Sequence, residues 1–407
     1  MVLRVPMPLQ EFGGEGAVMP TILDSEKIPI LLWCEKPDTE TLAQAKNLAN
    51  HPYVAHHVAI MADAHVGYGM PIGGVAATRG VVIPNAVGVD IGCGVSAVRT
   101  SLPSLDRARL KKLLGAIRRA IPLGFDHHPH PCPVSAMPAL PGKSAEKDLP
   151  VVSREFDKAR RQLATLGGGN HFIEIQQGET LWLMVHSGSR NLGHQVAQHY
   201  HRQATAWNAA HGGQLPSAWQ LDYLPLESGI GQCYFQEMTY CKDFAAANRR
   251  AMVNTICAIL AELEPATEFA EPLDVAHNYA AEEEHFGEQL VVHRKGAIRV
   301  DKGAPGIIPG SQGSCSYIVA GLGSPPSFFS CAHGAGRKLG RKQAQKLLDL
   351  RREIDHLEQQ GVLHSIRRRK DLDEAAGAYK DIEQVMARQK DLVRVVTRLR
   401  PLAVVKG

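Results

Sequence analysis

The segment from Asn85 to Gly94, with the sequence NAVGVDIGCG, places the strongest constraint on this chain. An aspartate and a cysteine lie three residues apart, at Asp90 and Cys93, shortly after the apolar run 81–84. The glycines within the segment allow tight backbone geometry that residues with a Cβ atom resist. A carboxylate and a thiolate held close together are suitable ligands for zinc or manganese. The segment therefore predicts one part of a metal site, whose remaining ligands come from elsewhere in the chain.

The composition limits the class of protein. The 407 residues are enough for one large domain or two ordinary ones, and 44% hydrophobic with 21% charged residues is typical of a soluble globular protein. The net charge of +4 is too small to indicate a nucleic-acid binder, so any basic surface has to be local. The eight cysteines form no CxxC pair, which predicts free thiols. Without an apolar run of 18 residues or a secretion-signal pattern, we expect a cytoplasmic protein with no membrane partner.

Apolar spacing predicts a mixture of helices and strands. Helices are expected at 40–50, 154–164, 234–263 and over much of the region after 338, and another from Leu105 to Ile121 with Ser104 as its N-cap. Strands are expected at 58–61, 181–185 and 402–405, with short irregular pieces over 1–35 and strands with turns over 287–319. The absence of a regular βαβ rhythm predicts an α+β fold. Residues 122–150, rich in proline, histidine and glycine, are predicted to form a long loop or insertion.

Five histidines share one kind of sequence context. Each lies close to a glycine, an asparagine or the end of a predicted strand, where ligands and catalytic groups are often placed. They are His65, His171, His186, His277 and His333. Any one of them alone is best explained as a hydrogen-bonded structural residue. As a set, and together with Asp90 and Cys93, they favour a metal site.

Two other patterns resemble ligand-binding sites, but the evidence for them is weaker. The run 126–132, DHHPHPC, is dense in ligand atoms, but its prolines restrict the backbone, so a structural loop is favoured over a metal site. The tripeptide Gly142-Lys143-Ser144 resembles the end of a phosphate-binding loop. That motif needs a glycine at position 137, which is a methionine here, so we reject it.

Three glycine-rich segments suit a phosphate ligand. Segments 309–314 (PGSQGS) and 333–337 (HGAGR) can turn successive backbone N–H groups toward an anion. Segment 187–190 (SGSR) adds hydroxyl groups and a guanidinium, which binds phosphate through two parallel hydrogen bonds. Each segment alone is an ordinary tight turn. The three together favour a polyphosphate or nucleic-acid substrate.

The most basic region of the chain is 334–370. It contains 11 Lys or Arg and 4 Asp or Glu, a local net charge of +7 that exceeds the balance of the whole chain. Such a run forms either a solvated helical face or a track for an RNA backbone, and the sequence does not decide between them. No aromatic residue occurs in this region before Tyr379, so base stacking is not indicated here.

Nine sequence runs resemble the RtcB RNA ligases and follow one another in the order of that family, from about residue 55 to the end. They are VIPNAVGVDIGCG (82–94), LGGGNHFIE (166–174), VHSGSR (185–190), HNY (277–279), RKGA (294–297), IIPGSQG (307–313), HGAGR (333–337), AYKDI (378–382) and the terminal VKG. We identify no match in 122–150 or 200–232. Asp63-Ala-His65 departs mildly from the expected D-V-H, and Gly340 replaces a serine that often precedes the arginine at 341.

The resemblance implies one domain of the RtcB type over 1–407, in which sheets form a central metal and nucleotide cleft flanked by helices. It also implies a ligase that depends on GTP and two Mn²⁺ ions and acts in RNA repair or tRNA splicing. The enzyme would join RNA ends bearing a 2′,3′-cyclic phosphate or 3′-phosphate to 5′-hydroxyl ends, through a histidine–GMP intermediate and an RNA-ppG end. An archease-type activator is a further partner that the resemblance admits.

The family's functional residues transfer onto this sequence motif by motif. Cys93 would bridge the two Mn²⁺ ions, with His186 and His277 completing one site and Asp90 and His171 the other. His333 would be the nucleophile. Arg190, Arg337 and Arg341 would contact RNA phosphate. The guanosine nucleotide would be held by Asn170, His171, Phe172, Ile173, Glu174, His277, Asn278, Pro309, Gly310, Ser311, Gln312, Ser316, His333, Gly334, Ala335, Gly336 and Lys406.

The chemistry of these residue types agrees with the transferred roles. A neutral imidazole is a good nucleophile and leaves readily once its phosphoramidate is attacked. The carboxylate of Glu174 is suited to accept hydrogen bonds from the N1–H and N2–H₂ edge of guanine. The chain contains no KxDG, the lysine signature of conventional nucleotidyl-transferring ligases.

Two other functions are weighed against ligation. A metal-dependent 2′,3′-cyclic phosphodiesterase would use the same metals but would give Glu174, Lys406 and His333 no role. A non-catalytic RNA-binding protein using 334–370 would leave the ligand set without a purpose.

Overall fold

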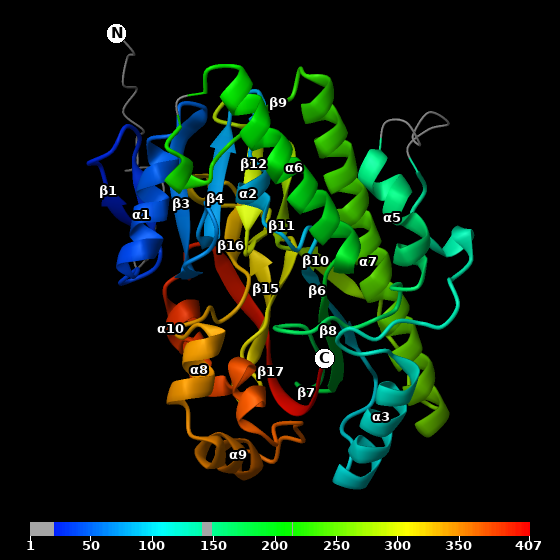
Figure 1. Cartoon of the computed structure of the whole chain (residues 1–407). Coiled ribbons are helices and arrows are strands. Elements are labelled where there is room, and N and C mark those ends of the chain that lie inside the picture. The colour runs from blue at the N-terminus through cyan, green and yellow to red at the C-terminus, as the bar shows by residue number, and fades with distance from the viewer. Residues whose placement is uncertain (1–19, 141–148, 214) are drawn as a thin grey trace.

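Two large β-sheets occupy the centre of the molecule, and helices cover their outer faces (Figure 1). The computed structural model describes residues 20–140, 149–213 and 215–407. Within these ranges, one sheet has six strands, in the order β1 (Thr21–Leu23), β2 (Ile30–Leu32), β3 (Val54–His65), β4 (Ile72–Thr78), β12 (Glu288–Lys295) and β11 (Asn278–His285). The other has seven, in the order β10 (Leu273–Ala276), β6 (Gly94–Arg99), β8 (Leu181–Ser187), β7 (Phe172–Gln177), β17 (Val393–Lys406), β15 (Ser316–Gly321) and β14 (Pro305–Ile308).

Short strand pairs and helices complete the described structure. The pairs are β5 (Val81–Val82) with β9 (Leu224–Pro225) and β13 (Ala297–Arg299) with β16 (Ser330–Ala332). The α-helices are α1 (Thr39–Ala49), α2 (Pro84–Val87), α3 (Arg107–Ala120), α5 (Pro150–Arg160), α6 (Arg190–Ala210), α7 (Gly229–Leu263), α8 (Arg341–Leu347), α9 (Leu350–Gln359) and α10 (Ile382–Ala387). Short 3-10 turns occupy Val134–Ala136, Ser217–Trp219, Pro325–Ser327, Arg369–Glu374 and Ala376–Ala378.

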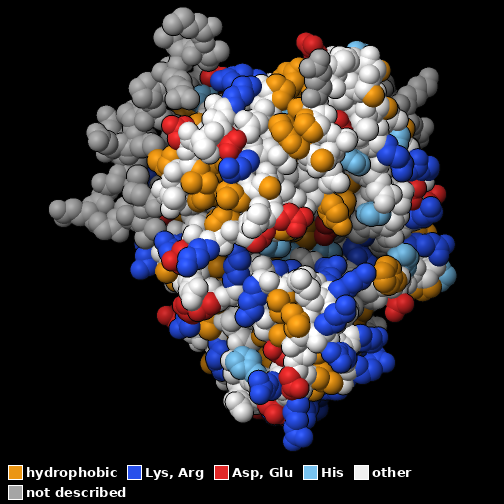
Figure 2. All heavy atoms as spheres, turned by 60° about the vertical axis from the view of Figure 1, so that its left-hand side comes forward, with side chains coloured by type: hydrophobic (Ala, Val, Ile, Leu, Met, Phe, Trp, Pro, Cys, Tyr) orange, Lys and Arg blue, Asp and Glu red, His pale blue; other side chains and the backbone are white. Residues whose placement is uncertain are grey.

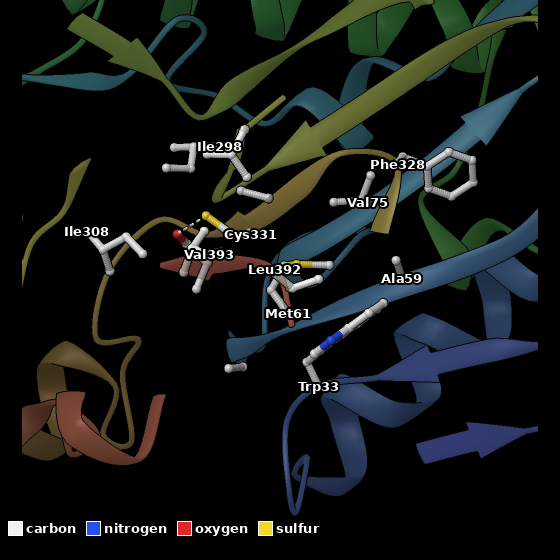
Figure 3. Close-up of a cluster of buried hydrophobic side chains, with 14 of the residues drawn as sticks. Trp33, Ala59, Met61, Val75, Ile298, Ile308, Phe328, Cys331, Leu392 and Val393 are labelled. Atoms are coloured by element: carbon white, nitrogen blue, oxygen red, sulfur yellow. Dashed lines mark hydrogen bonds between the residues drawn. The ribbon is translucent and has the colours of Figure 1, made fainter. Parts of the chain in front are cut away.

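The first sheet is buried on both faces, and β3 shows how. Successive side chains of a strand point to opposite faces. Ala59 and Met61 pack in the cluster of Figure 3, while Val58 and Ile60 pack in a second cluster beneath α1. The first cluster also contains Ile298 of β13, so it joins the sheet to the β13–β16 pair. This packing fixes the end of β3, where Asp63 and His65 lie.

The second sheet sorts its side chains in the same way. On β8, Leu181, Leu183 and Val185 pack against α3 and α7, while Trp182 and Met184 face the opposite cluster. Because side chains alternate along the strand, His186 points to the same face as Trp182 and Met184. Because β7 pairs with β8 in register, Phe172 lies opposite His186 and both belong to the same side of the sheet. The alternation therefore places His186 and Glu174 on the same face as Trp182, Met184 and Phe172, and the other face packs against the helices.

The α+β fold predicted from the sequence is confirmed. The helix expected at 40–50 is α1, the strand expected at 181–185 is β8, and the region 234–263 lies within one 35-residue helix, α7. Residues 122–140 form a loop with one 3-10 turn, while 141–148 lie outside the described residues. Whether this segment is an insertion relative to its family stays a prediction, and the expectation for residues 1–19 also lies outside the described ranges.

Several predicted boundaries were wrong, among them that of the helix expected at 154–164, which is α5 and begins at Pro150 and ends at Arg160. The N-cap of α3 is Asp106, not Ser104, and its carboxylate accepts the backbone N–H of Arg109 at 2.8 Å. The strand expected at 58–61 extends over the 12 residues of β3, because two histidines interrupt its apolar pattern without interrupting the strand. The strand expected at 402–405 is the end of the 14-residue β17, whose exposed arginines and Pro401 obscure the pattern.

No helix among the described residues combines the length and the apolar character that crossing a bilayer requires. A cytoplasmic location stays a prediction.

Candidate metal and nucleotide site

The loop that follows α2 carries Asp90 and Cys93 and is held from several directions. The backbone N–H of Gly92 donates to the carbonyl of Asn278 at 2.7 Å, and the Asn278 side chain donates to the carbonyl of Asp90 at 3.1 Å. Gly92 has φ +71°, and a Cβ atom there would lie 2.5 Å from the Cα of Lys242. Glycine is therefore required both for the backbone conformation and for the close approach of α7.

A fully buried arginine on α7, Arg249, also forms hydrogen bonds to this loop. The Nη1 of Arg249 donates to the carbonyls of Gly92 (2.9 Å) and Ser187 (3.0 Å). Its Nε and Nη2 donate to the two carboxylate oxygens of Asp274, at 2.6 and 2.7 Å. Arg249 thus ties the cysteine loop to the end of β8, which carries His186. Arg249 was not predicted from the sequence, although an arginine on the otherwise apolar face of a long helix indicates a buried, hydrogen-bonded charge.

Two groups of potential metal ligands meet at the Cys93 sulfur. Cys93, His186 and His277 form one group, and Asp90, Cys93 and His171 form the other, with ligand atoms within 4.8 Å of one another in each. The sulfur lies 3.2 Å from Nε2 of His186 and 3.4 Å from Nε2 of His171, whose Nε2 is also 2.9 Å from Oδ2 of Asp90. The structure therefore brings together all five of the ligands carried over by motif, from four different segments of the chain.

The electrostatics of this cluster favour a bound cation. Burial raises the pKa of the Cys93 thiol well above its usual value, and the carboxylate of Asp90 raises it further. Burial lowers the pKa values of His186 and His277 well below the usual value, so both rings are neutral and able to ligate. The buried Nδ1 of His277 has no hydrogen-bond partner among the described residues. A thiolate is stable here only beside a bound metal, and the donor set of sulfur, imidazole and carboxylate fits one.

His333 follows β16 and lies beside the ligand cluster. Its ring centroid is 4.7 Å from that of His277. Oδ2 of the buried Asp63 accepts the backbone N–H groups of His333 (3.1 Å) and Gly334 (3.2 Å) and lies 2.7 Å from Nδ1 of His333, without hydrogen-bond alignment to the ring. A Cβ atom at Gly336 would overlap the Asp63 carbonyl, so glycine allows this loop to lie against β3. Sequence reasoning missed the role of Asp63, whose proximity depends on long-range packing.

Glu174 lines the same cleft as His333 and is buried in a pocket of polar side chains. Nε2 of Gln176 donates to Oε2 of Glu174 at 2.6 Å and to Oγ of Ser316 at 2.9 Å. Burial raises the pKa of Glu174 to about 7, although Gln176 and Lys406 both act to lower it. Lys406 ends β17 opposite Phe172, and its Nζ lies 5.9 Å from the centroid of that ring. The pocket thus combines a carboxylate acceptor with a cationic donor.

The three predicted phosphate-binding arginines differ in how many of their N–H donors are already bound to protein acceptors. Arg337 donates to Glu374 (2.8 Å), to the carbonyl of Leu339 (3.0 Å) and to the carbonyl of Asp373 (2.5 Å). Nε of Arg341 is 2.9 Å from the other Glu374 oxygen, but this side chain stays 55% exposed. Arg190 donates to Thr165 Oγ1 (3.0 Å) and to the Gly124 carbonyl (2.6 Å) behind the cleft wall. Arg341 is therefore the most available of the three.

One cleft of about 1520 Å³ is lined by the five potential metal ligands, His333, Glu174, Lys406, Arg337 and Arg341. Figure 2 shows a hollow across the middle of one face, with Lys and Arg side chains along its lower side and acidic side chains above it. Of the residues expected to hold nucleotide, Ile173 and Ser316 are fully buried behind the wall. The others line the cleft: Asn170, His171, Phe172, Glu174, His277, Asn278, Pro309, Gly310, Ser311, Gln312, His333, Gly334, Ala335, Gly336 and Lys406.

Comparison with known proteins assigns the family. The sequence profile described as tRNA-splicing ligase RtcB matches residues 44–140 and 135–407. The chain belongs to the RtcB family. It is 36% identical to the RNA-splicing ligase RtcB of Escherichia coli K12, over 95% of this chain and 99% of that protein. It is 34% identical to the tRNA-splicing ligase RtcB of Thermococcus kodakarensis, over 90% of this chain and 91% of that protein, and 33% identical to that of Archaeoglobus fulgidus, over 91% and 92%.

The arginine on α7 generates a prediction about the stability of this RtcB family member. Arg249→Ala leaves Asp274 and two buried carbonyl groups without their partner, so we expect the free energy of unfolding to fall by about 3 kcal/mol. Denaturant unfolding followed by circular dichroism measures the change. The neighbouring Arg250→Ala is the matched control: its side chain is 69% exposed and 3.8 Å from Glu271, so we expect a change below about 0.5 kcal/mol. Equal effects of the two substitutions would contradict the supporting role of Arg249.

Proposed function

We propose that this RtcB family member is an RNA ligase that joins 3′-phosphate or 2′,3′-cyclic phosphate ends to 5′-hydroxyl ends. The observation that carries the proposal is His333. It lies beside a cluster of metal ligands, belongs to neither ligand group and has a buried carboxylate at one ring nitrogen. A hydrolase would need the metals but not this paired histidine. The ligase names of its relatives support the same reading.

We infer two metal ions, because both ligand groups contain Cys93. His186 and His277 would complete one site, Asp90 and His171 the other, with the thiolate shared. Mixed sulfur, nitrogen and oxygen donors are compatible with Mn²⁺. When bound, the ions would neutralise charge on the α-phosphate of GTP and on the leaving pyrophosphate.

His333 would attack the α-phosphorus of GTP through Nε2, since Asp63 faces Nδ1. A P–N bond forms, the bond from that phosphorus to the β-phosphate oxygen breaks, and pyrophosphate leaves with the electron pair. The ring keeps its Nδ1 proton and gains positive charge, which the carboxylate 2.7 Å away stabilises. Asp63 would also orient the ring through the two backbone N–H groups it accepts.

The later steps would transfer GMP to RNA. A 2′,3′-cyclic phosphate is first opened by water to a 3′-phosphate. An oxygen of the 3′-phosphate attacks the phosphorus of the histidine-bound GMP, the P–N bond breaks, and His333 is restored as RNA-ppG forms. The 5′-hydroxyl then attacks the RNA phosphorus and GMP leaves. Arg341, the most exposed of the three arginines, is the best placed to contact phosphate during these steps. An archease-type activator remains a proposed partner.

The nucleotide preference would come from Glu174. Its carboxylate can accept from guanine N1–H and N2–H₂, whereas adenine presents no such pair of donors. The Gln176 hydrogen bond fixes the carboxylate. Lys406 and the backbone of 309–312 would face the rest of the nucleotide.

The first test is covalent labelling. Incubation with α-labelled GTP and Mn²⁺, followed by denaturation, should leave a label that is acid-labile and alkali-stable, as expected for a phosphoramidate. His333→Ala should carry no label and should not ligate RNA. A wild-type protein that opens cyclic phosphates but takes up no label would instead be a phosphodiesterase. Label that persists in His333→Ala would exclude this histidine as the nucleophile.

The second test removes the shared thiol. Cys93→Ala should lose both ions, because each ligand group contains the sulfur, and labelling should fall by at least about a hundredfold. Metal content is measured by elemental analysis after gel filtration, independently of activity. Cys241→Ala is the control, since Cys241 is a buried free cysteine outside both groups. Retention of one full equivalent of Mn²⁺ by Cys93→Ala would argue against a bridging role.

The third test uses pH. The carboxylate form of Glu174 is needed to accept from guanine and is lost as the pH falls through about 7. The ratio of kcat/KM for GTP to that for ATP should therefore fall about tenfold between about pH 8 and about pH 6. Taking the ratio cancels titration of the phosphates and of the metal ligands. Glu174→Gln should lower the ratio at high pH and make it independent of pH, and a pH-independent ratio in the wild type would exclude this role.

A further inference from the structure

Two parts of the cleft lining, here called its arms, differ in charge. One arm is formed by residues 337–343 and carries Arg337, Lys338, Arg341 and Lys342. The other is formed by α1, the turn 66–69 and the turn 218–220, and carries the carboxylates of Asp38 and Glu40 with neutral side chains such as Gln44 and Asn47. The two arms therefore suit different parts of a substrate. The cationic arm suits phosphate, and the other suits a group with little negative charge.

Tyr68 is an aromatic residue left uncovered in the second arm. Its side chain lines the cleft, yet it is 69% exposed. Trp219, which is half-buried against the cluster beneath α1, lines the same arm. An exposed aromatic ring on a concave wall is unusual unless something covers it, and the flat face of a nucleobase is a matching partner.

The turn that presents Tyr68 is held rigidly. Nζ of the buried Lys295 donates to the carbonyl of Tyr68 at 2.6 Å and to that of Asn85 at 3.0 Å. The Gln44 side chain makes two hydrogen bonds with the backbone of Gly67: Nε2 donates to its carbonyl (2.6 Å) and Oε1 accepts its N–H (3.1 Å). Gly69 has φ +67°, and a Cβ atom there would lie 2.5 Å from the carbonyl oxygen of Gln220. A fixed backbone lowers the entropy that binding would cost.

Tyr68 is also close to the proposed nucleophile. Nδ1 of His65 accepts the backbone N–H of Arg337 at 3.5 Å, so the end of β3 contacts the loop that begins with His333. Lys295, which donates to the Tyr68 carbonyl, directly precedes Gly296, where a Cβ atom would lie 3.0 Å from Cε1 of His333. A base stacked on Tyr68 therefore belongs to one of the nucleotides next to the reacting ends.

We propose that Tyr68 is a stacking platform for a base at the 5′-hydroxyl end of the RNA. This inference rests on the proposed ligase function. The 5′-hydroxyl end lacks a terminal phosphate, so it is the strand end that the carboxylates of Asp38 and Glu40 repel least. The 3′-phosphate end is drawn to the cationic arm. Each arm thereby selects one strand end for ligation.

The test measures KM for each strand separately, with the other strand saturating. Tyr68→Ala should raise KM for the 5′-hydroxyl strand about tenfold and leave KM for the 3′-phosphate strand and the rate of His333 labelling unchanged. Tyr68→Phe should behave as wild type, because stacking needs the ring and not the hydroxyl. Tyr53→Ala is the control, since Tyr53 is 36% exposed and lies outside the cleft lining.

Substrates with an abasic nucleotide test which base of the RNA stacks on Tyr68. An abasic nucleotide at one of the first three positions of the 5′-hydroxyl strand should raise KM in wild type and have no further effect in Tyr68→Ala. An unchanged KM in Tyr68→Ala, a loss confined to the 3′-phosphate strand, or additive effects of the two changes would each overturn the inference. A wild-type protein that neither labels nor ligates would instead overturn the proposed function.

Discussion

The site depends on the Cys93 thiol, because both groups of potential metal ligands contain it. Burial and the Asp90 carboxylate disfavour the thiolate of Cys93, and the charge of Arg249 and a backbone hydrogen bond from Gly94 offset this only in part. The surrounding structure therefore has to hold the loop in place before any cation binds. Arg249 does so by donating to the carbonyl of Gly92, which directly precedes the thiol, and Asn278 does so from the opposite side. A bound metal would complete a site that the backbone has already shaped.

Each sheet contributes a different part of the cleft. The second sheet carries His186, Phe172 and Glu174 on one face, so the potential metal ligands and the Glu174 pocket share a rigid base. The first sheet supplies Asp63 at the end of β3 and Lys295 at the end of β12. His333 lies where they meet, in the loop after β16, which the buried cluster of Figure 3 attaches to the first sheet. The same cluster contains Tyr317 and Val319 of the second sheet, so one hydrophobic core connects the loop of His333 to both sheets.

The sequence predicted the site better than it predicted the supports of the site. The residues of the two potential ligand groups and His333 stand in distinctive local contexts, but so does His65, and their separate roles came from the resemblance to the RtcB ligases; the α+β fold followed from periodicity. Asp63, Arg249 and Glu374 were missed because their importance arises from partners 270, 157 and 37 residues away, respectively. Strand lengths were underestimated for a related reason: the histidines of β3 and the arginines of β17 break the apolar pattern, while pairing with neighbouring strands maintains the backbone.

Glu374 shows why similar arginines need not share one role. Its two carboxylate oxygens bind Arg337 and Arg341, and the hydroxyl of Tyr379 also donates to it. Arg337 has most of its donors committed to protein acceptors, so it shapes the loop after His333 and has little capacity left for an incoming phosphate. Arg341 offers only Nε to Glu374 and keeps an exposed guanidinium. One buried carboxylate therefore separates an arginine that builds the cationic arm from one that remains free to bind substrate.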